Sequence, residues 1–161
     1  MPFLDVHFEV QGDEELVRAF SLMASRVDDW RPFWPDIAAV FYVGEGARFD
    51  SQGFGSWPQL SDGYRKWKMK HYPGEKILSL TGDLRRSLTN RFSPDTVYED
   101  SPRELILGTI IHYAKYHQYG TRRMPPRPPI DITQEQVNEM AQRAIASFAH
   151  YADVLGFGTE T

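Results

Sequence analysis

Apolar and polar residues alternate along residues 3–10, and this pattern predicts a half-buried strand. Over residues 14–30 the apolar side chains recur every three or four positions, which predicts an amphipathic helix. A second helix is expected to begin at Pro35, because proline fits the first helical position. Gly44 and Gly46 should weaken the end of that helix.

Two later segments, residues 96–99 and 104–111, predict antiparallel strands joined by a short turn. The second carries apolar groups on both faces, as a central strand covered on both sides would. Ser61 and Thr81 are expected to cap two short helices. Thr133, with a Gln three residues later, fits a capping box at the start of a long helix with an apolar stripe.

Together these elements predict one α+β domain over residues 1–161. In it, a small and mainly antiparallel sheet packs against long N- and C-terminal helices. Residues 48–57 are rich in Gly and Ser and are expected to form an exposed loop. Tyr64 and Trp67 lie on one side of a short helix, a spacing that favours a place in the core.

Residues 113–130 (YAKYHQYGTRRMPPRPPI) combine an aromatic run, one glycine, three arginines and four prolines. Residues 113–119 are expected to form a short helix that Gly120 stops in a left-handed conformation. The prolines then exclude both helix and central strand, leaving an extended, basic arm over residues 120–130. Such an arm is suited to contact with something outside the domain.

Composition and charge limit the classes of function that this chain can have. The 161 residues include 41% hydrophobic residues and no cysteine, so a packed core is expected, but neither disulfides nor thiolate metal sites. No apolar run approaches the roughly 20 residues of a membrane span, and the start does not resemble a signal peptide, so we expect synthesis in the cytoplasm and no membrane contact.

The net charge of −4 is uneven: residues 1–29 carry −5, residues 64–91 carry +6 and residues 131–161 carry −4. Acidic ends around a basic middle indicate complementary surfaces between copies or with partners, although ordinary solvated faces would give the same pattern.

No catalytic constellation stands out, and we predict neither enzyme activity nor a cofactor or metal. His112 and His117 are five residues apart, about 140° around a helix, which is a poor arrangement for one metal ion. Two alternatives stay open. One is a nucleic-acid-binding accessory protein that uses the basic stretch 64–91. The other is a hydrolase with a site at His112, His117 and Asp131.

Several short motifs occur in a fixed order along residues 48–130. They are an Arg-Phe pair at 48–49, then WPQLS at 57–61, ILSLTGDLRRSL at 77–88, HQYG at 117–120 and MPPRP at 124–128. In this order the chain resembles the phage virion morphogenesis or tail-completion proteins of Mu-like contractile-tailed phages and related prophages. It departs from them at Pro126 and Pro129, where that family often has Ala and Phe. The TRR run at 121–123 is also similar to neck proteins of long-tailed siphophages.

The resemblance implies a structural virion protein that completes the tail and forms part of the head–tail neck. Such proteins assemble as a ring, usually of six copies, between the tail tube or terminator and the head connector. It therefore implies a homo-oligomer, tail terminator or tube proteins and connector proteins as partners, and DNA within reach of the lumen. The location implied is the head–tail neck or head-proximal tail end of the virion, with the host cytoplasm as the site of assembly.

From the arm and the loop we predict two groups of site residues. Arg122, Arg123 and Arg127 are expected to pair with acidic groups on a neighbouring subunit. His117 and Gln118 are expected to hold the root of the arm by hydrogen bonds. The complete set of expected contact residues is Gln52, Phe54, Arg122, Arg123, Met124 and Arg127, and the root residues are His117, Gln118 and Gly120.

Overall fold

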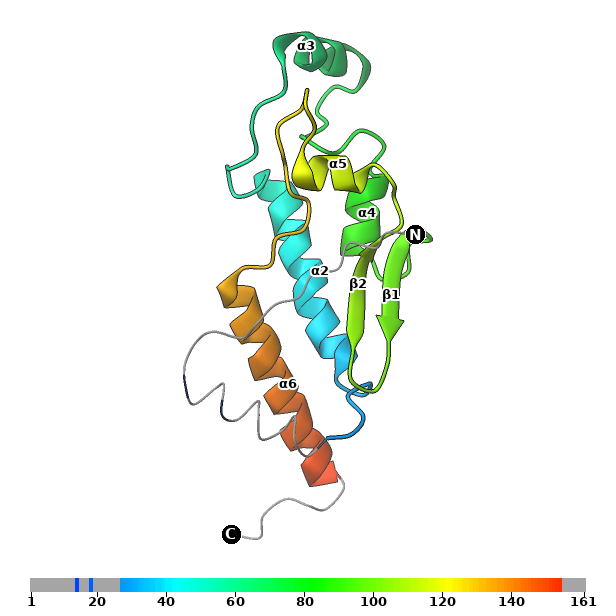
Figure 1. The fold of residues 1–161 in the computed structure, drawn as a ribbon, viewed down its shortest axis with the longest axis vertical. Helices are drawn as coiled ribbons and strands as arrows, with labels where there is room; N and C mark the ends of the chain where they lie inside the picture. Colours follow the sequence, from blue (N-terminus) through cyan, green and yellow to red (C-terminus); the bar gives the residue numbers. More distant parts are fainter. Residues whose placement is uncertain (1–13, 15–17, 19–26, 155–161) are drawn as a thin grey trace. The chain divides into compact units, whose positions relative to one another are not determined.

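The computed structural model describes residue 14, residue 18 and residues 27–154 (Figure 1). It confirms the α+β fold, with a two-stranded antiparallel sheet and a long C-terminal helix. The elements in order are α2 (Trp34–Ser51), α3 (Asp62–His71), α4 (Asp83–Thr89), β1 (Thr96–Asp100), β2 (Leu105–Thr109), α5 (Ala114–Tyr119) and α6 (Gln134–Val154).

Two predictions concern the N-terminal region. The strand expected at residues 3–10 lies outside the described residues. Of the helix expected at residues 14–30, Glu14 and Arg18 are helical, whereas residues 27–30 are not. The predicted helix therefore extends too far at its C-terminal end.

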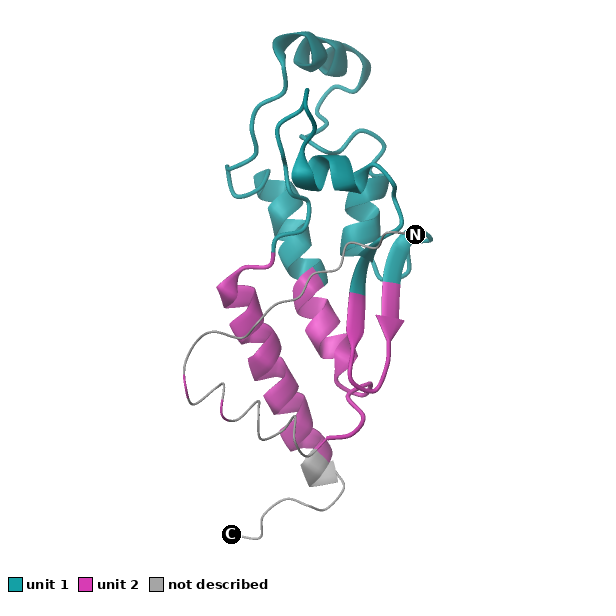
Figure 2. Cartoon of the chain, viewed as in Figure 1, with its two compact units in different colours: residues 1–4, 42–97, 107–131 teal, residues 5–41, 98–106, 132–161 magenta. Residues whose placement is uncertain are grey.

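The chain divides into two compact units (Figure 2). Unit 1 comprises residues 1–4, 42–97 and 107–131, and unit 2 comprises residues 5–41, 98–106 and 132–161. The division passes through α2 and through the β1–β2 hairpin, so both elements contribute residues to each unit.

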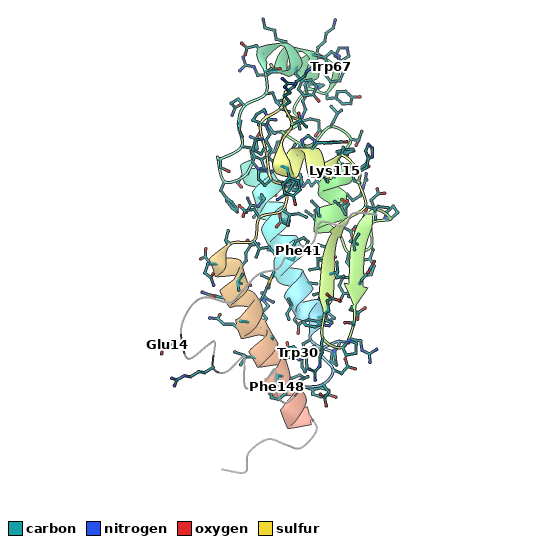
Figure 3. The ribbon with its side chains drawn as sticks, in the orientation of Figure 1. Glu14, Trp30, Phe41, Trp67, Lys115 and Phe148 are labelled. Atoms are coloured by element: carbon teal, nitrogen blue, oxygen red, sulfur yellow. The ribbon has the colours of Figure 1, made fainter. Side chains whose placement is uncertain are left out.

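Aromatic side chains form the centre of unit 2. Trp30 contacts Phe33 edge-on and stacks on Trp34, with ring centroids 5.7 Å apart in both pairs. Phe33 in turn contacts Phe148 and Tyr151 of α6, at 6.1 and 5.7 Å (Figure 3 labels Trp30 and Phe148). The buried apolar residues of the first half of α2 and of α6 complete this core: Ile37, Ala38, Val40, Phe41, Val137, Met140, Ala141 and Ala144.

The capping box at the start of α6 is confirmed. The backbone N–H of Gln136 donates to the Thr133 hydroxyl at 3.2 Å, and the backbone N–H of Thr133 donates to the Gln136 side-chain oxygen at 2.9 Å. Two N–H groups that a helix terminus leaves without partners are thereby satisfied.

In unit 1, α2 continues through Gly44 and Gly46 and ends at Ser51. The exposed loop expected at residues 48–57 is therefore wrong in its first four positions, and only residues 52–56 form turns. Arg48, Phe49 and Trp57 are buried. A glycine inside a helix costs about 1 kcal/mol, and burial of a side chain such as that of Phe49 offsets this cost.

Within the described part of the chain, β2 pairs with β1 alone, and the central position expected from its apolar faces stays a prediction. The start of α4 differs in detail from the prediction. The residue before α4 is Gly82, with a positive φ of 80°, and the Thr81 hydroxyl donates to the Asp83 carboxylate at 2.6 Å instead of capping a backbone N–H. Leu84 and Leu88 of α4 are fully buried, as their spacing predicts.

Glu45 is the carboxylate most deeply buried in unit 1, with no exposed surface. Its Oε2 atom lies 3.5 Å from Nε of Arg48. Burial raises the pKa of Glu45 from 4.5 to about 8, although Arg48 and a backbone N–H of Asp131 act in the opposite direction. At neutral pH this side chain is therefore largely protonated.

We expect the free energy of unfolding to fall as the pH rises from about 5 to 8, because the folded state holds the Glu45 proton more tightly than the unfolded chain does. The slope from one such group is at most about 1.4 kcal/mol per pH unit. Glu45→Gln should flatten the dependence, and the exposed Glu104→Gln should not. Urea unfolding at pH 5, 6.5 and 8 measures it, and identical pH profiles for Glu45→Gln and the unaltered protein would contradict this assignment.

Candidate interaction surface

The arm begins at Gly120, where α5 ends. Gly120 has φ of 73° and ψ of −179°, so its φ is positive as expected but its conformation is not that of the left-handed helix. A Cβ atom at this position would lie 2.9 Å from the Met124 carbonyl oxygen and 2.9 Å from the Pro126 nitrogen. Both the backbone conformation and the close approach of the arm therefore require glycine.

Residues 121–124 form a tight turn at the tip of the arm. The Thr121 N–H donates to the Met124 carbonyl at 2.8 Å, and the Met124 N–H donates to the Thr121 carbonyl at 3.2 Å. Arg122 and Arg123 occupy the two central positions and are exposed. Neither forms an ion pair with another described residue, so two guanidinium groups project from a closed turn.

Backbone and side-chain hydrogen bonds hold the returning half of the arm to α5. The Gln118 amide donates to the Ile130 carbonyl at 2.7 Å and accepts from the Ile130 N–H at 3.2 Å. The Arg127 N–H donates to the His117 carbonyl at 2.7 Å. The arm is thus a strap fixed at its root, with its tip as the exposed part.

The side chain of Arg127 is buried and connects the arm to residues 58 and 59. Its Nε donates to the Pro58 carbonyl at 2.6 Å and its Nη2 donates to the Gln59 carbonyl at 2.8 Å. In the same region the Trp57 indole N–H donates to the Pro128 carbonyl at 3.1 Å. Proline has no backbone N–H, so side chains supply the donors that these two extended segments lack.

The end of the arm is attached to α2 through Arg48. The guanidinium of Arg48 donates to the Asp131 carbonyl, and its Nη1 lies 3.2 Å from the Asp131 carboxylate. Arg48 also faces Glu45, as described above. Two buried arginines therefore fix the returning arm: Arg127 connects it to residues 58 and 59, and Arg48 connects its end to α2.

A cavity of about 800 Å³ lies within unit 1, between α3, the turn before α4, α5 and the arm. Its apolar lining includes Leu60, Leu78 and Met124, and its cationic lining includes Lys68 and Arg123. We call it the arm groove.

His117 and Arg127 also line the arm groove. Nδ1 of His117 is buried and has no hydrogen-bond partner among the described residues. Burial, with a smaller effect of Arg127, lowers the pKa of His117, so this imidazole is neutral at pH 7.

Beside the arm groove, α3 presents aromatic side chains to solvent. The Tyr64 and Trp67 rings stack with centroids 5.5 Å apart, and Trp67 stacks on His71 at 4.9 Å (Figure 3 labels Trp67). Tyr64 and Trp67 are both 43% exposed, so the prediction that they belong to the core is wrong. The buried residue of α3 is instead Lys68, whose ammonium donates to the Lys76 carbonyl.

The predicted contact residues occupy different environments. Arg122 and Arg123 are exposed at the tip, and Phe54 is 59% exposed with the Arg48 guanidinium 5.2 Å from its ring centroid. Met124 and Gln52 are half-buried, and the Gln52 side chain accepts from the Ile77 N–H at 3.3 Å. The list of expected contacts is corrected at one position: Arg127 is buried and is not available to a neighbouring subunit in this structure.

Of the predicted root residues, Gln118 and Gly120 hold the arm as described above, whereas His117 does so through its backbone carbonyl and not through its ring. Sequence reasoning did not identify Lys68 and Glu45 as buried residues. Their only signal in the sequence is a charged residue on an otherwise apolar helix face. Asp131, a member of the alternative hydrolase site, pairs with Arg48. Residues 27–154 contain no group of three His, Asp or Glu side chains that could hold a metal ion, and no helix in this range could span a membrane.

Comparison with known sequences finds a matching family and similar proteins. The profile of the phage virion morphogenesis family matches residues 12–149. The chain is 39% identical over 75 residues to a putative capsid assembly protein G of Escherichia phage Mu, a match that covers 45% of this chain and 42% of that protein. It is 26% identical over 138 residues to the Mu-like prophage FluMu G protein 1 of Haemophilus influenzae, covering 84% of this chain and 90% of that protein. No solved structure matches significantly.

We expect Arg127→Ala to lower the free energy of unfolding by about 3 kcal/mol, because it removes two charge-assisted hydrogen bonds and leaves two carbonyls without donors. The double variant Arg122→Ala/Arg123→Ala should change it by no more than about 0.5 kcal/mol, since both side chains are exposed. Urea denaturation measures both. Equal stability of the two variants would show that Arg127 does not hold the arm.

Gly120→Ala should lower the free energy of unfolding by about 1–3 kcal/mol, because the new Cβ meets backbone atoms and the positive φ is strained. Gly63→Ala in α3 is the matched control, since nothing lies within 4 Å of its added Cβ and alanine favours a helix. Thermal unfolding compares the two variants, and a Gly120→Ala protein as stable as the control would contradict the described arm geometry.

Proposed function

The chain belongs to the phage virion morphogenesis family, and we propose that it completes the tail and forms part of the head–tail neck. In this role it assembles as a ring, most simply of six copies, between the tail tube or terminator and the head connector. The role is structural and not enzymatic, and it locates the protein in the virion, at the neck or the head-proximal tail end, after assembly in the host cytoplasm.

The distribution of charge between the two units is the observation that carries this proposal. Unit 1 has 13 Lys and Arg against 7 Asp and Glu, a net charge of +6. Unit 2 has 5 against 15, a net charge of −10. A ring is built from head-to-tail contacts between two different surfaces of one chain, and opposite charge on two units supports such contacts.

Exposed apolar side chains support the same conclusion. Among the described residues, eleven large hydrophobic side chains remain exposed, and ten of them belong to unit 1. Contiguous exposed apolar groups are typical of interaction sites. Within unit 1 the stacked and exposed rings of Tyr64 and Trp67 form such a group.

The relatives support assembly in general terms. The phage Mu protein is named for capsid assembly, and the match spans 42% of its length. Within the proposed role, the arm tip with Arg122 and Arg123 and the turn with Gln52 and Phe54 contact the neighbouring subunit or the adjoining ring. Phage DNA would be reached only through the lumen of the ring.

A second candidate function is nucleic-acid binding through the basic stretch 64–91. The exposed, cationic and aromatic surface of α3 favours it. Strongly salt-dependent binding of an oligonucleotide by the isolated protein, lost in Lys66→Ala/Lys70→Ala, would support this candidate over the ring.

We expect Arg122→Ala/Arg123→Ala to reduce the yield of infectious particles more than tenfold, although the monomer stays folded. Loss of about 1 kcal/mol at each contact is repeated around a ring. Complementation of a phage that lacks this protein measures the yield, and negative-stain imaging should show filled heads and separate tails.

Lys115→Ala is the control, because Lys115 is an exposed cation of α5 away from the arm tip. Normal particle yield with the double variant would disprove the role of the arm tip. Complete particles formed without the protein would disprove the proposed function itself.

A further inference from the structure

Nearly all side chains of α3 are exposed, and these include its large apolar ones. Trp67 and Met69 are 43% and 68% exposed, while the buried residue is a lysine. A surface helix normally turns its apolar side chains inward. We define the α3 face as the exposed side chains of Tyr64, Trp67 and Lys70, which follow one another at intervals of three residues, together with Lys66, one turn before Lys70.

The α3 face continues into the arm groove, since Tyr64 belongs to both. The cations Lys68, Arg123 and Arg127 line the groove against one acid, Asp83, and Arg123 is the exposed cation among them, since Lys68 and Arg127 are buried and donate to backbone carbonyls. That acid already accepts from Thr81 and pairs with Arg86. Lys66 and Lys70 form no ion pair with a described residue. The combined surface therefore suits an occupant with carboxylates and some apolar contact area.

The aromatic stack favours a peptide over a nucleic acid. Tyr64 precedes Trp67 by three residues and His71 follows it by four, so the two rings stack on the indole from opposite ends of the same helical stripe. Bases bind aromatic side chains by stacking on a free ring face. Because two rings of the same chain already stack on the indole, its remaining exposed surface is better suited to protein side chains than to an additional base.

Unit 2 carries the complementary group at the end of the β1–β2 hairpin. Glu99, Asp100 and Glu104 are exposed and form no ion pair with a described residue. Other described acids of unit 2 are engaged: Asp28 with Arg103, Asp29 with Arg31, Glu139 with Arg143, and Asp36 with Ser147. Glu14 and Glu135, the latter in the first turn of α6, also form no ion pair with a described residue.

The hairpin end is held in place from inside unit 2. The Trp30 N–H donates to the Pro102 carbonyl and the Trp34 indole N–H donates to the Ser101 carbonyl, both at 2.8 Å. Since the backbone is fixed by these bonds, the acidic side chains are presented at low entropic cost. Pro102 adds an exposed apolar surface between them.

We propose that the α3 face and arm groove of one copy bind the hairpin end, residues 99–104, of a second copy. Lys66, Lys70 and Arg123 pair with the three carboxylates, and Trp67 packs against Pro102. The contact joins two different surfaces, so each copy can bind one neighbour on each side. This inference rests on the proposed ring and specifies which surfaces form it.

Charge exchange tests the contact in solution. Variant A is Lys66→Glu/Lys70→Glu/Arg123→Glu, and variant B is Glu99→Lys/Asp100→Lys/Glu104→Lys. Analytical ultracentrifugation should show self-association of the unaltered protein and at least tenfold weaker association of A alone and of B alone. An equimolar mixture of A and B should associate again, because every contact in an alternating assembly is then between opposite charges. Circular dichroism confirms that each variant is folded.

Cysteine cross-linking tests the position directly, since the chain has no cysteine of its own. His71→Cys protein mixed with Pro102→Cys protein should form a disulfide-linked dimer under mild oxidation, because His71 is exposed and lies beside Trp67. Phe92→Cys replaces His71→Cys in the control, because Phe92 is 88% exposed in unit 1 but lies outside the α3 face. Equal yields with Phe92→Cys and His71→Cys would overturn the proposal.

Three other results would also overturn it. They are an unaltered protein that stays monomeric at its solubility limit, A and B variants that associate normally, and a mixture that fails to associate. Oligonucleotide binding lost in variant A, without any change in self-association, would assign the α3 face to nucleic acid. If the cross-link fails while phage lacking the protein makes unjoined heads and tails, the proposed function stands without this contact. If the cross-link forms but such phage is normal, the contact stands and the proposed function falls.

Discussion

The structure of unit 1 depends on the buried guanidinium of Arg127. Residues 125–129 contain four prolines, so this segment offers few backbone donors and cannot join a sheet or a helix. Residues 58–60 are likewise outside any regular element. Arg127 donates hydrogen bonds to the carbonyls of residues 58 and 59, and the Trp57 indole N–H donates to the Pro128 carbonyl. A segment that reads as a free arm is therefore a strap bound along its length, and this confines its exposed cations to the tip.

Arg127 is one of three cations that unit 1 buries, together with Arg48 and Lys68, and all three donate to backbone carbonyls. A buried cation is costly unless its donors are satisfied, and carbonyls of irregular segments are acceptors that need such donors. In unit 1 the buried cations and the carbonyls of its long loops satisfy one another. The exposed cations on α3 and at the arm tip donate to no such backbone carbonyls. Because the fold does not use them in this way, they are candidates for contacts in assembly.

The sequence predicts well whatever depends on local pattern. The capping box at Thr133, the helix with its Leu84–Leu88 pair, and the hairpin were all expected at nearly their observed positions. It fails where distant residues decide the outcome. The last turn of α2 forms despite Gly44 and Gly46 because Phe49 is buried in unit 1, and Lys68 is buried instead of Trp67 because the Lys76 carbonyl lies within its reach. Arg127 meets acceptors 68 and 69 residues away, a pairing that no local spacing reveals.

The charge of the units also bears on the symmetry of assembly. A two-fold contact is made by the same surface on both copies, so a two-fold contact through unit 1 brings +6 against +6, and one through unit 2 brings −10 against −10. Both are opposed by repulsion that a head-to-tail contact avoids. Electrostatics at this level selects the mode of association and speeds encounter, while salt weakens it. The persistence of a contact must therefore come from apolar surface, and unit 1 exposes that surface in the form of Trp67, Met69 and their neighbours. In the proposed head-to-tail contact, opposite charges would orient neighbouring copies and these apolar side chains would hold them together.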